Sequence, residues 1–141
     1  IKNSKLIKRN IVEIFKKPSV LFKKTSLMDQ FKIFHGSFFL EKSLELLSSA
    51  NRSDFIKFLN GSELNPYNMF ICRNSKILTE FYNEIFPWLF RCEEKFKDLN
   101  LKGYDKVRIY GFLAERYMPY WFKKNFNTTT CPITFFEPKN N

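Results

Sequence analysis

Apolar residues recur at helical spacing along most of the chain. Near the N-terminus, in residues 4–17, they fall at positions i, i+4, i+7 and i+8 starting from Ile7, and Pro18 follows. This spacing predicts a basic amphipathic helix that ends before the proline. Such a helix either covers the protein surface with its basic side in water or lies on an anionic membrane.

Helix signals continue beyond this segment. Ser26 and Asp29 have the spacing of a capping box, so a helix is predicted to begin there and to run toward His35, where Gly36 breaks it. Apolar residues at helical spacing predict a second helix over 38–49.

Three more helices are predicted farther along. The first is short, covers 54–59 and has Ser53 as its cap. The second is the clearest in the chain, is capped by Asn74 or Ser75, and carries its apolar stripe as far as residue 96. The last spans about 105–124.

Strand signals are few. Residues 67–72 form a nearly continuous apolar run that contains one amide, Asn68, and this is the best candidate for a strand. Residues 19–22 and 133–136 are weaker candidates, and 127–130 is predicted to be a loop. The expected fold class is therefore α+β, mostly helical with two or three short strands.

The length of 141 residues fits a single domain, and the composition of 44% hydrophobic and 27% charged residues is that of a globular protein. Two or three short strands do not make a self-sufficient sheet. We therefore expect residues 1–141 to be one domain and a fragment of a larger protein.

The charge is strongly positive. Lys and Arg number 24 against 14 Asp and Glu, which gives a net charge of +10. A basic surface suits polyanions, namely nucleic acid, anionic lipid headgroups or phosphorylated small molecules, and the composition does not choose among them.

Cysteine usage and the apolar runs indicate a cytoplasmic protein. The three cysteines are widely spaced, which favours neither a disulfide framework nor a zinc site and fits a reducing compartment. No apolar run is long enough to span a membrane, and the basic start does not look like a signal peptide.

Polar residues within apolar segments are the candidates for chemistry. His35 is the only histidine and is interpreted either as a packing residue or as a ligand-binding one. Asn68 needs hydrogen-bond partners in its apolar run, and these belong either to the neighbouring backbone or to a ligand.

The densest such segment is 108–116. Arg108, Phe112 and Glu115 share one helical face because they are spaced by four and three residues. Glu115 is either a general base or the partner of an arginine in a structural ion pair. The chain has no glycine-rich phosphate loop and no Asp-x-Asp pair, so it holds no ligand motif for a metal.

Two segments resemble a known family. They are Asn-Pro-Tyr-Asn-Met-Phe-Ile-Cys at 65–72 and Arg-Ile-Tyr-Gly-Phe-Leu-Ala-Glu-Arg at 108–116, followed by Trp121. Their order resembles the C-terminal half of a bacterial family of glycosyltransferases in capsular polysaccharide and lipopolysaccharide synthesis, formerly a domain of unknown function. The similarity covers about residues 19–137, and residues 1–18 precede it as the basic amphipathic helix.

The resemblance implies a GT-A-like α/β fold that uses a sugar nucleotide as donor, with Mn or Mg in some relatives, and a glycan as acceptor. It places Glu115 on the acceptor side as catalytic base or sugar-positioning carboxylate. It gives Tyr67 and Asn68 contacts with sugars, and Arg108 and Arg116 contacts with the donor phosphate or with Glu115. His35 corresponds, more weakly, to a histidine segment of the family.

The expected function is thus the acceptor-side part of a glycosyltransferase at the inner face of the bacterial membrane, inactive without a nucleotide-binding half. The alternative is a basic module without catalysis that binds nucleic acid or an anionic membrane. Nucleic acid is the less favoured partner, because the aromatic residues follow helical core stripes and no nucleic-acid motif is present.

Overall fold

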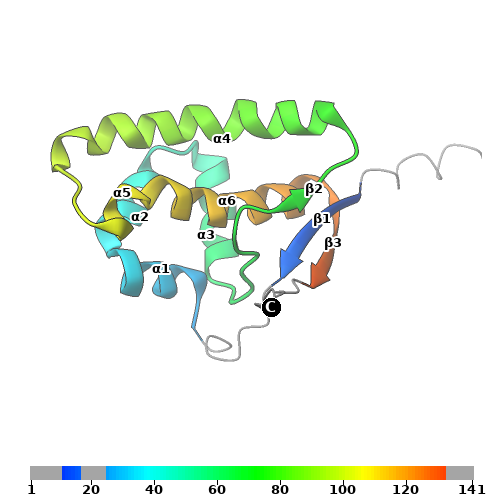
Figure 1. The fold of residues 1–141 in the computed structure, drawn as a ribbon, viewed down its shortest axis with the longest axis horizontal. Coiled ribbons are helices and arrows are strands. Elements are labelled where there is room, and N and C mark those ends of the chain that lie inside the picture. Colours follow the sequence, from blue (N-terminus) through cyan, green and yellow to red (C-terminus); the bar gives the residue numbers. More distant parts are fainter. Residues whose placement is uncertain (1–10, 17–24, 133–141) are drawn as a thin grey trace, which may run out of the picture.

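The computed structural model describes residues 11–16 and 25–132. Helices make up most of this part, and a small three-stranded sheet lies at one end (Figure 1). The fold is α+β and mostly helical, as the sequence predicts. No helix in the described part is both long and apolar enough to cross a membrane.

The first helices follow their caps. Helix α1 (Leu27–His35) begins as predicted, because the Ser26 hydroxyl accepts a hydrogen bond from the backbone N–H of Asp29. Gly36 ends it with a φ of 89°, in the region that favours glycine. Helix α2 (Ser37–Glu45) follows directly.

The predicted break at residues 51–53 is wrong. Helix α3 (Ser49–Leu59) begins at Ser49, since Ser48 and not Ser53 accepts the capping hydrogen bond, here from the backbone N–H of Asn51. Helix α2 correspondingly ends at Glu45, before the predicted residue 49. Ser48 and Ser53 are equally good caps in the sequence, and only the packing of the helix selects one.

The long helix is α4 (Ser75–Phe96), capped by the Asn74 side chain, and a 3₁₀ turn, η2 (Lys97–Leu99), continues it. The predicted final helix is two helices instead, α5 (Tyr104–Val107) and α6 (Ile109–Asn125). They separate at Arg108. Its backbone N–H donates to the Tyr104 carbonyl and ends α5, and its carbonyl accepts from the N–H of Phe112 and begins α6.

Helix α6 is the centre of the fold. All seven residues of 116–122 are buried, so this segment is covered on every side. Helix α4 runs alongside it, α3 crosses it, and α1 and α2 lie near its N-terminal end (Figure 1). Aromatic rings from these helices form most of the core between them; the largest fully buried ones are Trp88, Tyr117, Phe31, Phe55, Phe96 and Phe122.

The N-terminal helix prediction is wrong where the structure can test it. Residues 11–16 form strand β1 (Ile11–Lys16), the centre of a sheet with the order β2-β1-β3. The segment Ile-Val-Glu-Ile-Phe-Lys is rich in β-branched and aromatic residues, which favour strands. It also lies between two strands that pair with its backbone N–H and C=O groups. This pairing favours a strand although the apolar residues have helical spacing.

The other strands also differ from the prediction. Strand β2 is only Phe70–Ile71, antiparallel to β1 with Ile14 opposite Phe70, because the chain turns at 67–68. Strand β3 (Asn127–Pro132) replaces the predicted loop at 127–130, and it runs parallel to β1. The strands predicted at 19–22 and 133–136 lie outside the described residues.

Candidate functional site

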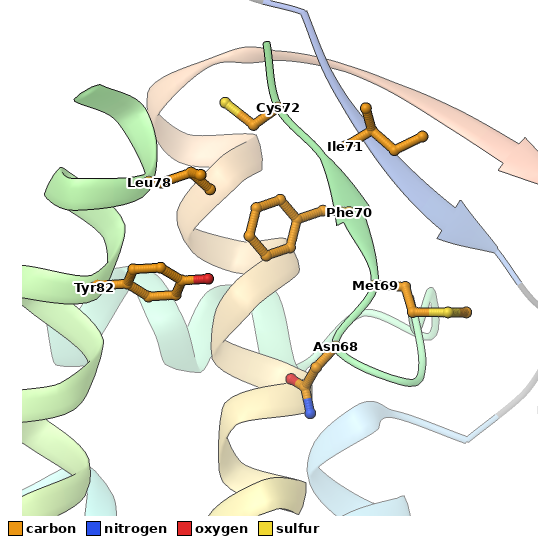
Figure 2. A pocket seen from close by; sticks show the side chains of 7 residues that line it. All are labelled: Asn68, Met69, Phe70, Ile71, Cys72, Leu78 and Tyr82. Atoms are coloured by element: carbon orange, nitrogen blue, oxygen red, sulfur yellow. The ribbon is translucent and has the colours of Figure 1, made fainter. Parts of the chain in front are cut away.

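An open groove of about 650 Å³ lies where β2 passes the first turns of α4 (Figure 2). It is lined by Asn68, Met69, Phe70, Ile71, Cys72, Leu78 and Tyr82. A smaller hollow of about 190 Å³ shares Asn68, Phe70 and Tyr82 and reaches toward Ala114 and Met118 of α6. Asn68, which the sequence singles out, therefore borders both spaces.

The groove combines aromatic and polar groups. The Phe70 ring is anchored against Phe81 and Phe122, with ring centroids 5.8 and 4.6 Å away. Tyr82 is 42% exposed, and its hydroxyl points into the space toward Phe70 (Figure 2). A fixed ring, a phenol and an amide thus border one open surface, which suits a ligand with apolar faces and hydroxyl groups.

The turn before β2 is strained. Tyr67 and Asn68 have φ values of 74° and 50°, in the left-handed region that non-glycine residues rarely adopt. Asn tolerates this conformation, but for Tyr67 it costs about 1–2 kcal/mol. A pair of neighbouring non-glycine residues in this region needs other contacts to hold it.

Helix α6 supplies those contacts. The Glu115 carboxylate accepts a hydrogen bond of 2.5 Å from the backbone N–H of Tyr67. The Asn68 side-chain N–H donates to the carbonyl of Gly111, at 3.3 Å. The structure thus brings together Tyr67, Asn68 and Glu115, which the sequence proposes separately, in one turn-to-helix contact at the edge of the groove.

Arg116 lies behind this contact. Its side chain is only 3% exposed, and its guanidinium is 3.8 Å from the second oxygen of Glu115. The guanidinium also donates to the Phe112 carbonyl and the Gln30 side chain, both at 3.1 Å, and covers the Phe31 ring. Desolvation lowers the pKa of Arg116 to about 10, against the attraction of Glu115. Arg116 therefore faces the core rather than the groove.

His35 is the last residue of α1, and Arg108 directly precedes α6. His35 is buried, stacks on Phe112 with centroids 4.0 Å apart, and meets Phe31 edge-on at 4.9 Å. Arg108 is exposed, donates to the Tyr104 hydroxyl and lies 5.7 Å from the centroid of Phe112. Phe112 therefore links these two predicted residues, and neither of them lines the groove.

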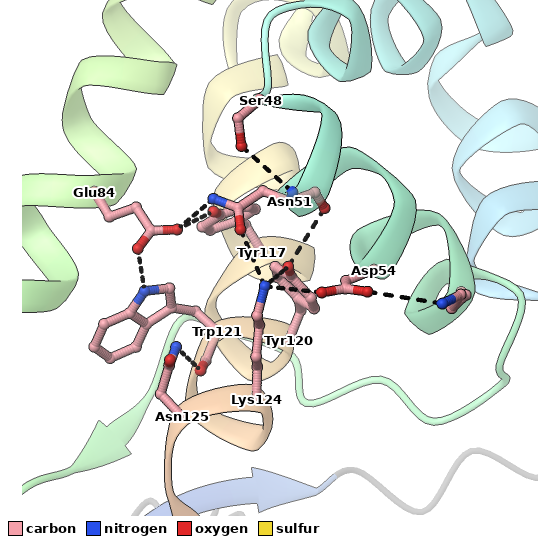
Figure 3. A network of polar contacts seen from close by, with 10 residues as sticks. Ser48, Asn51, Asp54, Glu84, Tyr117, Tyr120, Trp121, Lys124 and Asn125 are labelled. Atoms are coloured by element: carbon pink, nitrogen blue, oxygen red, sulfur yellow. Dashed lines mark hydrogen bonds and ion pairs between the residues drawn. The ribbon is translucent and has the colours of Figure 1, made fainter.

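A second polar cluster has no counterpart in the sequence analysis (Figure 3). Glu84 of α4 accepts hydrogen bonds from the Tyr117 hydroxyl at 2.6 Å, the Trp121 indole N–H at 2.8 Å and the Asn51 amide at 3.0 Å. Burial, together with the nearby Glu84 carboxylate, raises the pKa of Tyr117. The cluster fastens α3 and α4 to the central helix.

Lys124 extends this cluster toward the surface. Its ammonium donates to Asp54 at 2.9 Å, to the Asn51 side chain at 3.1 Å and to the Tyr120 hydroxyl at 3.3 Å. The hydrogen bond from Lys124 lowers the pKa of Asp54. One signal in the sequence points to the cluster: Glu84 falls beside the apolar stripe of α4, between Phe81 and Trp88, where a carboxylate needs buried donors.

The described residues do not fit a divalent metal. They contain no group of three or more His, Cys, Asp or Glu side chains that could hold one. Glu115, the carboxylate at the turn beside the groove, already accepts a backbone N–H and faces the cation of Arg116. We therefore assign no step to a metal.

The chain was compared with known proteins. No curated protein and no solved structure matches it. The family described as a domain of unknown function (DUF4422) matches residues 2–126, which include the groove, the turn at 67–68 and the Glu84 cluster. The match covers most of the chain, and the protein therefore belongs to this family.

Proposed function

We propose that the protein is the acceptor-side part of a glycosyltransferase that transfers a sugar from a sugar nucleotide to a precursor of a bacterial surface polysaccharide. The observation that carries the proposal is the groove, where Phe70, Tyr82 and Asn68 border one open surface. Sugars bind by laying their C–H faces on aromatic rings while their hydroxyls bond to amides and phenols, and this lining offers both contacts.

The turn at 67–68 gives the site its shape. It places Asn68 at the junction of the groove and the smaller hollow, and Glu115 fixes it from behind. In this proposal Tyr67 and Asn68 contact the acceptor glycan, and Arg116 orients the Glu115 carboxylate. Glu115 is either the base that removes the proton of the acceptor hydroxyl or the residue that positions the turn.

The donor and the location follow from charge. A net charge of +10 favours the diphosphate of a sugar nucleotide, and Arg108 carries an exposed guanidinium at the start of α6. We propose that the protein acts in the cytoplasm, because the proposed donor, a sugar nucleotide, is present there. His35 packs against Phe112 and Phe31 and is assigned a packing role in this proposal.

The test is binding of glycans to the groove. Purified protein is titrated with neutral oligosaccharides and with nucleoside diphosphate sugars by ligand-detected NMR. We expect oligosaccharides to bind and Tyr82→Ala to weaken that binding about tenfold, which corresponds to about 1.4 kcal/mol for one lost ring contact.

The matched control is Phe90→Ala. Phe90 is an exposed aromatic residue of the same helix that does not line the groove, so its removal should leave the affinity unchanged. No binding of any oligosaccharide, or equal losses in the two variants, would contradict the assignment of the groove to a glycan.

A further inference from the structure

Exposed apolar side chains gather at the end of the molecule opposite the sheet. They are Ile33, Phe34, Phe38, Tyr104 and Val107, and their exposed fractions range from 44% to 72%. We call these five residues the end patch. They come from the last turn of α1, the first turn of α2 and helix α5, which lie close together at this end (Figure 1).

Direct contacts hold these segments together. The Lys106 ammonium of α5 donates to the carbonyl of His35, at 2.8 Å, and lies over the Phe39 ring of α2, 4.6 Å from its centroid. Phe38 and Phe39 both pack on Phe96 at the end of α4. The segments that carry the end patch are therefore in direct contact in the folded protein.

Positive charges accompany the apolar residues. The contacts of Lys106 are with a carbonyl and a ring, and those of Arg108 are with the Tyr104 hydroxyl and the rings of Tyr104 and Phe112. None of these groups neutralises a cation. Lys102 is a third cation of this region and is exposed in the loop before α5.

The carboxylates of this region are fewer. From residue 97 to residue 108 the sequence has four cations, Lys97, Lys102, Lys106 and Arg108, and two carboxylates, Asp98 and Asp105. Lys97 already pairs with Glu94 of α4. The segment still keeps a net positive charge beside an exposed apolar surface.

We propose that the end patch docks on an anionic lipid surface. Aromatic and aliphatic side chains enter the boundary between headgroups and acyl chains, while the long cationic side chains reach the phosphates beside them. This contact is made by the folded end of the helical body. The membrane-binding helix that the sequence predicts near the N-terminus does not form over residues 11–16, which are a strand.

Charge selects a lipid surface over a second copy of the chain. A second copy presents the same cations, so a symmetric contact through this patch would place Lys106 and Arg108 near their own counterparts. An anionic bilayer attracts these side chains and covers the apolar residues at the same time. No residue of the groove takes part in this contact, and Arg108 is shared with the donor site proposed above.

The experiment is co-sedimentation of the purified protein with vesicles. One set is phosphatidylcholine alone, and the other is an equimolar mixture of phosphatidylcholine and phosphatidylglycerol. We expect binding to the anionic vesicles that weakens as the NaCl concentration rises, and much weaker binding to the neutral ones. The double variant Ile33→Glu with Val107→Glu should lower the partition coefficient at least about tenfold.

The control adds the same two carboxylates elsewhere. Thr79→Glu with Phe90→Glu changes exposed positions of α4 outside the end patch, and its binding should stay close to that of the unmodified protein. Circular dichroism verifies that the variants fold. Should the Ile33 and Val107 variant not fold, Lys102→Gln with Arg108→Gln should reduce both the binding and its salt dependence, because both side chains are exposed.

Three results would overturn the proposal. They are equal binding to neutral and anionic vesicles, equal losses in the patch and control variants, and a dimer in solution that the patch variant converts to a monomer. The last result, measured by light scattering, would assign the end patch to a second copy.

Discussion

Glu84 and Glu115 are carboxylates on the two long helices that pack together, and their surroundings differ in kind. Glu84 accepts three hydrogen bonds from side chains of α3 and α6, all regular elements. Glu115 accepts one from the backbone N–H of Tyr67, in a turn whose φ values are unfavourable. One carboxylate joins rigid parts, and the other holds a strained segment in place.

The difference separates stability from function. A carboxylate that accepts three hydrogen bonds between helices stabilises one packing arrangement. The strained turn lies beside an open groove and places Asn68 where both hollows meet. Proteins keep such strain mainly at binding sites.

The largest expected effect is on the Glu84 cluster. Glu84→Ala leaves the Tyr117 hydroxyl, the Trp121 indole and the Asn51 amide without their acceptor, so we expect unfolding to become easier by about 3 kcal/mol. Chemical denaturation measures this loss. Glu80→Ala, at an exposed position of the same helix, should change stability by less than about 0.5 kcal/mol. If Glu84→Ala lowered the free energy of unfolding by no more than Glu80→Ala does, the cluster would not stabilise the packing of α3, α4 and α6.

An intermediate effect is expected at alkaline pH. Burial and Glu84 raise the pKa of Tyr117, and burial raises that of Cys92 to about 12. Both groups keep their protons in the folded state at a pH where the unfolded chain has lost them, so the folded state binds more protons and its stability falls with rising pH. The loss should begin near the ordinary pKa values of Cys and Tyr.

Thermal unfolding monitored from pH 7 to pH 10 tests this sign, because above this range the lowered pKa of Arg116 acts in the opposite direction. Tyr117→Phe removes one of these titrations and should flatten the decline, although it also removes a hydrogen bond to Glu84 and lowers stability at neutral pH. A melting temperature that stays constant or rises across this range would contradict the expected direction.

Helices were the most predictable part of the fold, because their signals are local. Ser26 and Asn74 cap α1 and α4 as the sequence predicts, and the apolar stripe of α4 is buried along its length. Strands depend on partners far away in sequence. Asn127–Pro132 contains three threonines and little apolar patterning, and it becomes a strand because β1 lies beside it.

The site was predictable in its residues but not in its contacts. The sequence indicates Asn68 as an amide in an apolar run and Glu115 as a carboxylate among apolar neighbours. That these two positions meet depends on a left-handed turn at Tyr67, for which the sequence offers no glycine. Glu84 was missed because its three donors come from two other helices, and no local pattern records their approach.

The smallest and most informative effect concerns Glu115. Glu115→Ala removes the acceptor of the Tyr67 N–H and should cost about 1.5 kcal/mol of stability, whereas Glu115→Gln keeps an oxygen in the same place and should cost less. Tyr67→Gly relieves the backbone strain, so Glu115→Ala should cost less in that background, and a double-mutant cycle measures this coupling. Tyr67→Ala is the control, because it removes the aromatic ring but leaves the backbone strain in place.

Transfer assays on the same variants, in the presence of the nucleotide-binding half that the proposed function requires, decide the role of Glu115. A general base cannot be replaced by an amide, so a catalytic Glu115 predicts that Glu115→Gln folds normally and transfers no sugar. A positioning Glu115 predicts that Gln keeps most of the transfer activity and that Ala loses it, with partial recovery when Tyr67→Gly lets the turn form without the carboxylate. The two roles therefore predict different relative transfer activities for the Gln and Ala variants. Stability measured in parallel shows whether a loss of activity arises from unfolding.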